Sequence, residues 1–162
     1  MAKKLSIITH PNPILRKKTV DVSVSQLADQ TFQAFLDVLS VTMKEADGIG
    51  LAAIQTGELV SVAVVMMDEG PMHFINPKII SYSKKKQSEA EACLSVPGVA
   101  GTVARATEIR VQALDRKGEE LLFVAHDYFA RVLQHEIDHL NGILYIDRAE
   151  KIWDDAEKKK KA

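Results

Sequence analysis

The spacing of hydrophobic residues predicts an α-helix in the first third of the chain. Between residues 25 and 46, apolar side chains recur mostly at steps of three and four, which is the period of one helix face. These side chains belong to Leu27, Phe32, Phe35, Leu36, Leu39, Met43 and Ala46. The pattern stops at Asp47-Gly48, so we expect the helix to end there.

Shorter apolar runs in the middle of the chain predict β-strands. Residues 59–67 have the apolar and β-branched content of a buried strand. Residues 72–75 and 79–83 predict two further short strands, which Asn76-Pro77 separates.

A hairpin and a second helix are predicted in the last third. Apolar and polar residues alternate over 109–113, and a second β run over 120–125 follows a turn at residues 115–118. From Asp127, apolar residues return at helical spacing until Asn141-Gly142. The order of one helix, many short strands and a second helix is typical of an α+β domain.

The length of the chain suits one hydrophobic core. It has 162 residues and no internal repeat. We therefore predict a single domain over residues 1–147, followed by a short C-terminal helix and a basic tail over residues 148–162.

Charge and composition exclude several classes of protein. Lysine and arginine number 21 against 22 acidic residues, a balance that lacks the electrostatic footprint of a general nucleic-acid binder. No apolar stretch approaches the ~20 residues of a membrane-spanning helix. The first residues lack the apolar core of an export signal. We therefore expect a cytoplasmic protein that binds neither membranes nor a specific nucleic-acid sequence.

The second predicted helix carries a candidate metal site. His135 and His139 are four residues apart, so both ring nitrogens can reach one metal ion from the same helix face. Glu136 lies beside them, where it can act on a bound water. The alternative is a solvated polar face, because so short a motif also occurs by chance.

The third ligand of such a site has to be found elsewhere. A catalytic site of this kind uses three protein ligands and an open position for water. The metalloprotease pattern HExxHxxGxxH would need a histidine where the chain has Tyr145. A downstream carboxylate would be Glu150 or Glu157. Cys93 is the other strong ligand, although a lone cysteine is most often a small buried hydrophobe.

Three segments resemble the signature motifs of peptide deformylases. Residues 48–55 match GxGxAAxQ, residues 91–95 resemble EGCLS, and residues 134–139 match QHExDH. The resemblance extends from about residue 10 to residue 147. It implies short, mostly antiparallel strands around a central C-terminal helix that carries HExxH. It also implies a hydrolase that removes the formyl group from the N-terminal formyl-methionine of new polypeptides.

The resemblance also implies roles for individual residues. Members of the family hold one divalent metal ion, Fe(II) in most cells, and zinc, nickel or cobalt can replace it. The corresponding ligands are Cys93, His135 and His139. Glu136 corresponds to the general base and acid. The side chain of Gln55 and the backbone N–H of Leu94 would donate hydrogen bonds to the formyl oxygen.

Two further sets of residues are expected near this centre. Gly48 and Gly50 would let a peptide approach the backbone closely, and Ile49 between them would offer an apolar wall. Glu91 and Arg105 are expected to form an ion pair that supports the loop bearing Cys93. If the pair is exposed instead, it would contribute little to stability.

The chain departs from the family in its substrate pocket. Ala92 replaces the usual glycine before the cysteine, which would cost about 1 kcal/mol if that position needs a positive φ. Tyr128, Arg131 and Glu89 stand where apolar pocket residues are usual. Arg131 either turns outward or pairs with Glu89, leaving its stem and Val132 to contact substrate, or it makes the pocket smaller and more polar.

The expected partners are N-formylated nascent peptides. The lysine run Lys158, Lys159, Lys160 and Lys161 could add a weak ribosome contact through counterion release. Three other functions compete with this interpretation: hydrolysis of a different N-formyl substrate, an HExxH endopeptidase, and a non-catalytic binder of formylated peptides.

Overall fold

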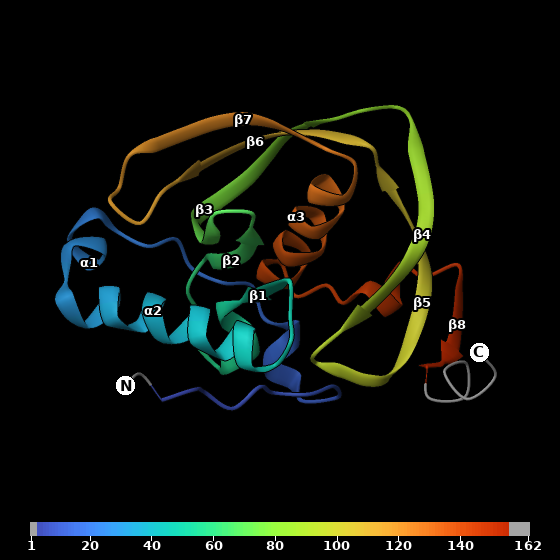
Figure 1. Cartoon of the computed structure of the whole chain (residues 1–162), viewed down its shortest axis with the longest axis horizontal. Helices are drawn as coiled ribbons and strands as arrows, with labels where there is room; N and C mark the ends of the chain where they lie inside the picture. Colours follow the sequence, from blue (N-terminus) through green and yellow to red (C-terminus); the bar gives the residue numbers. More distant parts are fainter. Residues whose placement is uncertain (1–2, 156–162) are drawn as a thin grey trace.

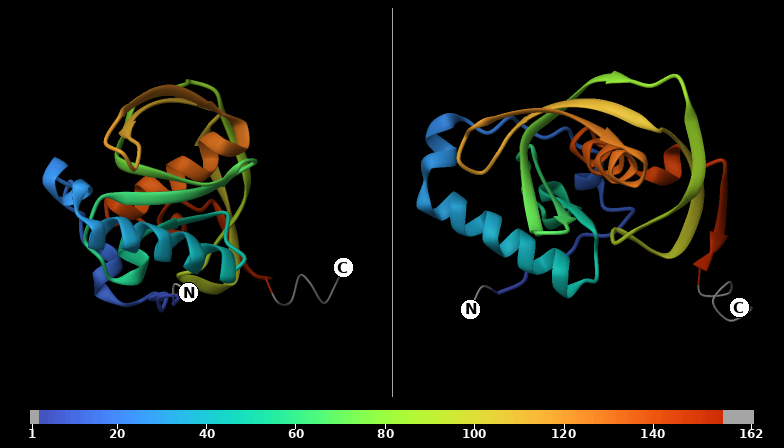
Figure 2. Two further views of the ribbon diagram at one scale, coloured as in Figure 1. Left: turned by 60° about the vertical axis from the view of Figure 1, so that its left-hand side comes forward. Right: turned by 45° about the horizontal axis from the view of Figure 1, so that its top comes forward.

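In the computed structural model, which describes residues 3–155, two β-sheets surround the helix α3 (Asp127–Leu140) (Figure 1). The larger sheet has the strand order β1-β2-β3-β6-β7 and the smaller has the order β4-β5-β8. Every pairing between these strands is antiparallel. The right-hand view of Figure 2 looks nearly along α3 and shows the strands around it. The predicted α+β class with antiparallel strands around a C-terminal helix is confirmed.

The elements have the following bounds. The larger sheet contains β1 (Gly50–Ala52), β2 (Val62–Met67), β3 (Gly70–Tyr82), β6 (Glu108–Leu114) and β7 (Glu120–His126). The smaller sheet contains β4 (Lys86–Cys93), β5 (Val96–Ala106) and β8 (Lys151–Asp154). Two helices precede the sheets, α1 (Val24–Ala28) and α2 (Gln30–Glu45). Three short 3-10 turns are η1 (Pro13–Arg16), η2 (Ala53–Thr56) and η3 (Tyr145–Asp147).

The first predicted helix is in fact two helices. Asp29 has an extended backbone and its side chain accepts the N–H groups of Thr31 and Phe32, so it caps α2 and separates it from α1. A short acidic side chain accepts hydrogen bonds from the free N–H groups at the start of a helix. The cap at Asp29 therefore divides the helix, although the hydrophobic spacing continues across it and predicted one helix.

Strand β3 runs through the dipeptide that was expected to divide it. The side chain of Asn76, whose φ is 51°, accepts the N–H of Val22 and donates to the carbonyl of Val22. The register with β6 shifts between Ile75 and Lys78, which places Pro77 in a β-bulge. The prediction of two short strands was therefore wrong.

The smaller sheet was not predicted over residues 86–106, because β4 is exposed along most of its length and lacks an apolar run. The C-terminal segment also differs from its prediction. Residues 151–154 form β8, which pairs with residues 99–102 of β5, instead of a helix. The smaller sheet thus continues past residue 147. Lys158 to Lys161 lie outside the described residues.

Polar residues on α3 lie inside the molecule. Arg131, Gln134, Glu136, Asp138 and His139 are each at most 9% exposed. Such groups need hydrogen-bond partners in the folded protein, and their partners define the site described below. Among the described residues, no helix has the length and apolar character that would carry it across a membrane.

Candidate active site

Three potential metal ligands converge from one strand and one helix. Cys93 is the last residue of β4, while His135 and His139 lie one turn apart on α3. Their ligand atoms all lie within 4.8 Å of one another, and Cys93 Sγ is 3.3 Å from His139 Nε2. One thiolate and two imidazoles suit zinc or iron. Glu150 instead accepts a hydrogen bond from Ser88, and Glu157 lies outside the described residues.

Glu91 orients one of the two histidines. Nδ1 of His135 lies 2.8 Å from Glu91 Oε1, which leaves the ring's Nε2 for a metal. Arg105 donates to both carboxylate oxygens, from Nε and from Nη2, at 2.9 Å each. The expected Glu91–Arg105 ion pair is therefore present, and it is buried. Burial alone would raise the pKa of Glu91, but hydrogen bonds from His135 and Arg105 outweigh it and lower that pKa to about 2.

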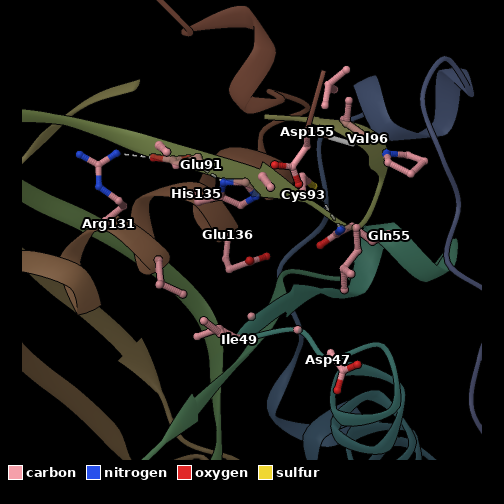
Figure 3. Close-up of a pocket in the computed structure, with 18 of the residues that line it drawn as sticks. Asp47, Ile49, Gln55, Glu91, Cys93, Val96, Arg131, His135, Glu136 and Asp155 are labelled. Carbon is pink, nitrogen blue, oxygen red and sulfur yellow. Dashed lines mark hydrogen bonds and ion pairs between the residues drawn. The ribbon is translucent and has the colours of Figure 1, made fainter. Parts of the chain in front are cut away.

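The carboxyl of Glu136 is buried beside His135, in the centre of the pocket (Figure 3). Its Oε2 has no hydrogen-bond partner in the described part of the chain. Burial raises the pKa of Glu136 to about 7. A carboxyl with that pKa can both accept and return a proton near neutral pH. Burial also lowers the pKa of His139 well below its usual value, so the neutral ring is favoured.

The absence of a side chain at Gly50 makes room for Glu136. A Cβ at Gly50 would lie 2.6 Å from Oε1 of Glu136 and 3.0 Å from its Cδ. A Cβ at Gly48 would meet Leu94 Cδ1 at 2.9 Å. Neither glycine has a positive φ, so the need for glycine here is space and not backbone conformation.

Replacing Gly50 by alanine is expected to lower, at least tenfold, the kcat of the hydrolysis that the family resemblance implies. The added Cβ would push the Glu136 carboxyl out of position. Metal content and the far-ultraviolet circular dichroism spectrum should stay as in the wild type, since Cys93 and the two histidines are untouched. A Gly50→Val variant should be worse than Gly50→Ala. An unchanged kcat in Gly50→Ala would contradict this prediction, since the position of the Glu136 carboxyl would then not limit the reaction.

Gln55 lies in η2 with a fixed amide group. Its Oε1 accepts the N–H of Ala52 at 2.9 Å, while its Nε2 donates to Ser95 Oγ at 3.0 Å and lies 3.7 Å from Cys93 Sγ. The amide nitrogen is thereby held against Cys93 and Ser95, the residues on either side of Leu94. Ser95 was missed as a site residue, although it lies in the second sequence motif.

A pocket of about 380 Å³ lies over these groups. Its two walls belong to the edge strands of the two sheets: residues 48–50 at β1 and residues 90–93 at the end of β4. The first turns of α3 add Tyr128, Arg131 and Val132. Sequence reasoning missed the remaining lining residues. They are Asp47, Ala90, Val96, Pro97, Gly98, Val99 and Asp155.

Two predicted pocket features look different in the structure. Ala92 lines the pocket, but it is not among the described residues with positive φ. The backbone strain that a positive φ would cause at this alanine is therefore absent. Glu89 does not line the pocket. Its side chain is 46% exposed, and one oxygen lies 3.6 Å from Nε of Arg131.

Arg131 does not turn outward. It is 5% exposed, and its Nη1 donates to Glu91 Oε2 at 2.6 Å and to the carbonyl of Val103 at 2.8 Å. Its Nη2 donates to the carbonyl of Gln87 at 2.5 Å. The pairing expected with Glu89 is present but long, and the close carboxylate partner is Glu91 (Figure 3).

Tyr145 supports the site from behind. Its ring stacks on His135 with centroids 5.9 Å apart, and its hydroxyl donates to the carbonyl of Val99 in the pocket wall. It is only 1% exposed. The sequence showed Tyr145 only as a position that lacks a third histidine, and nothing in a linear pattern signals a tyrosine ring stacked on a histidine.

Comparison with known proteins gives consistent matches along most of the chain. The family model for polypeptide deformylase matches residues 4–154. Peptide deformylase of Syntrophomonas wolfei is 47% identical over 143 residues, which cover 88% of this chain and 91% of that protein. Peptide deformylase 1 of Clostridium acetobutylicum is 42% identical over 143 residues, covering 88% of this chain and 93% of that protein.

Solved structures agree with the sequence comparison. A class I type b peptide deformylase from Acinetobacter baumannii, bound to Met-Ala-Ser, superposes with a TM-score of 0.87 at 32% identity. The match covers 91% of this chain and 99% of that one. Peptide deformylase from Thermotoga maritima gives a TM-score of 0.87 at 34% identity, covering 92% of this chain and 99% of that one.

Proposed function

Because this chain belongs to the peptide deformylase family and removes the N-formyl group from new polypeptides, we propose that Cys93, His135 and His139 hold the divalent metal ion of that reaction. The observation that carries this assignment is their convergence beside the buried, unpartnered carboxyl of Glu136. Neither an endopeptidase nor a non-catalytic binder finds support among the relatives.

The donor set fits a divalent ion with an open position. Two imidazoles and a thiolate are ligands that both iron and zinc accept. We assign Fe(II) as the metal in the cell, and zinc, nickel or cobalt as ions that the same three atoms can hold. When bound, such an ion polarises the formyl carbonyl and makes a water molecule more acidic.

Glu136 moves the proton. Its Oε2 accepts a proton from the water that attacks the formyl carbon, and the same carboxyl later delivers that proton to the departing amine nitrogen. The amide of Gln55 and the backbone N–H of Leu94 donate hydrogen bonds to the formyl oxygen as negative charge develops on it. The products are formate and a free N-terminal amine.

The peptide binds between the two sheets. β1 and β4 are edge strands of the two sheets, and residues at each of them line the pocket. An extended peptide can pair with the backbone of residues 48–50 and 90–92 as an added strand. The first side chain, that of formyl-methionine, then lies against Tyr128, Val132 and the stem of Arg131.

The remaining expectations concern the setting of the reaction. We assign the catalytic groups to residues 1–147, which contain every ligand named above, while β8 completes the smaller sheet and Asp155 adds to the pocket lining. We place it in the cytoplasm, on N-formylated nascent peptides. Lys158 to Lys161, which lie outside the described residues, are assigned a weak contact with ribosomal RNA.

The decisive assay measures formate release from formyl-Met-Ala-Ser by nickel-loaded protein of known metal content. Rapid release is expected, and a formyl-norleucine peptide should serve equally well. Formyl-glycine and formyl-aspartate peptides should react at least tenfold more slowly. Full metal occupancy without release would contradict the assignment, and a preference for formyl-glycine would point to a different N-formyl substrate.

A further inference from the structure

The carboxylate of Glu91 has more partners than a simple ion pair. It accepts two hydrogen bonds from Arg105, one from Arg131, and one from the ring N–H of His135. The two residues of α3 take different oxygens: Arg131 Nη1 bonds Oε2, and His135 Nδ1 bonds Oε1. All four hydrogen bonds are 2.6–2.9 Å long.

This arrangement ties a helix to a strand at two points. Arg131 and His135 are four residues apart on α3, so they reach the same carboxylate from successive turns. Glu91 belongs to β4, which ends two residues later at Cys93. Its contact with Arg131 therefore fixes the strand that carries the thiolate against the helix that carries both imidazoles.

Arg131 strengthens this link beyond the carboxylate. Its guanidinium also donates to the backbone carbonyls of Gln87 in β4 and Val103 in β5. Arg105 cannot replace these contacts, because it lies in β5 and directs its Nη1 to Asp138 on a later turn of α3. Arg131 thus joins the first turns of α3 to β4 and β5, the two strands on either side of the turn that follows Cys93.

We propose that Arg131 is a positioning residue for the metal centre. Its guanidinium holds Oε2 of Glu91, so that Oε1 stays directed at Nδ1 of His135 and Cys93 stays at its distance from the two histidines. The proposal rests on the assignment of those three residues as ligands. It adds a role for a side chain that also lines the pocket.

The test compares Arg131→Met and Arg131→Lys with the wild type. Methionine keeps the unbranched stem but offers no donor, while lysine keeps the charge without the planar fork. Zinc affinity, measured by competition with a chromophoric chelator, should fall 10- to 100-fold in Arg131→Met and less in Arg131→Lys. The absorption spectrum of the cobalt-loaded protein should shift in both variants, because the ligand geometry changes.

A second readout uses the metal-free protein. The ring N–H of His135, followed by nitrogen-edited NMR, should exchange faster with water in Arg131→Met, because Glu91 has lost one of the two arginines that hold it. Arg116→Met, which alters a distant arginine bound to Gln33 and Asp37, serves as control.

Wild-type zinc affinity and an unshifted cobalt spectrum in Arg131→Met would overturn the proposal. If that variant does not fold, the same comparison in Arg131→Lys decides the matter. A wild-type protein that binds no zinc would be a separate failure, since it would refute the ligand assignment itself. Loss of formate release with unchanged zinc affinity would place Arg131 in substrate binding alone and would equally overturn its positioning role.

Discussion

Replacing Glu136 by glutamine is expected to lower kcat roughly 10²- to 10⁴-fold, the range that a general base contributes. Glutamine has nearly the same shape, so it fits under Gly50 as glutamate does. It cannot accept the proton of the attacking water at the atom that is unpartnered in the structure. The measurement is formate release under saturating formyl-Met-Ala-Ser, with KM taken from the same data.

Metal affinity separates this prediction from simple damage to the site. Glu136 is not among the three converging ligands, so Glu136→Gln should bind zinc within a fewfold of the wild type. Glu119→Gln, in an exposed turn, provides the control for the loss of one negative charge. A kcat within tenfold of wild type would remove Glu136 from its role as base.

Replacing Cys93 by serine is expected to abolish formate release and to weaken zinc binding at least ~100-fold. A serine hydroxyl stays protonated near neutral pH and is a poor ligand, whereas a thiolate is a strong one. The half-buried position beside Gln55 tolerates the smaller oxygen, so the fold should persist. Competition titration gives the zinc affinity, and circular dichroism gives the fold.

Glu150→Gln is the matched control, because Glu150 was the alternative third ligand and here accepts a hydrogen bond from Ser88 instead. Its zinc affinity should equal that of the wild type. If Cys93→Ser kept full affinity while Glu150→Gln lost it, the ligand set would have to be reassigned.

Local spacing predicted the parts of the site that lie within one element. His135, Glu136 and His139 follow from helix geometry, because residues four apart share a helix face. The hairpin of β6 and β7 likewise follows from alternation and its turn. Cys93 joined the histidines through its chemistry and its sequence motif, and the structure brings it next to them.

Contacts between elements could not be predicted in this way. β4 exposes most of its residues, so no apolar pattern marked it as a strand, and its pairing with β5 was unforeseen. The surroundings of Arg131 depend on β4 packing against α3. In a linear sequence a buried arginine is indistinguishable from an exposed one, and its true partner, Glu91, is 40 residues away.

The shortness of β1 limits how much of a substrate's sequence the enzyme can recognise. In the proposed binding mode the peptide pairs only with residues 48–50, where β1 begins, and with residues 90–92 at the end of β4, so these hydrogen bonds reach only its first few residues. Main-chain pairing is blind to side-chain identity, and beyond the first residue little else would discriminate among polypeptides. We therefore expect the enzyme to accept polypeptides with many different sequences after the first residue.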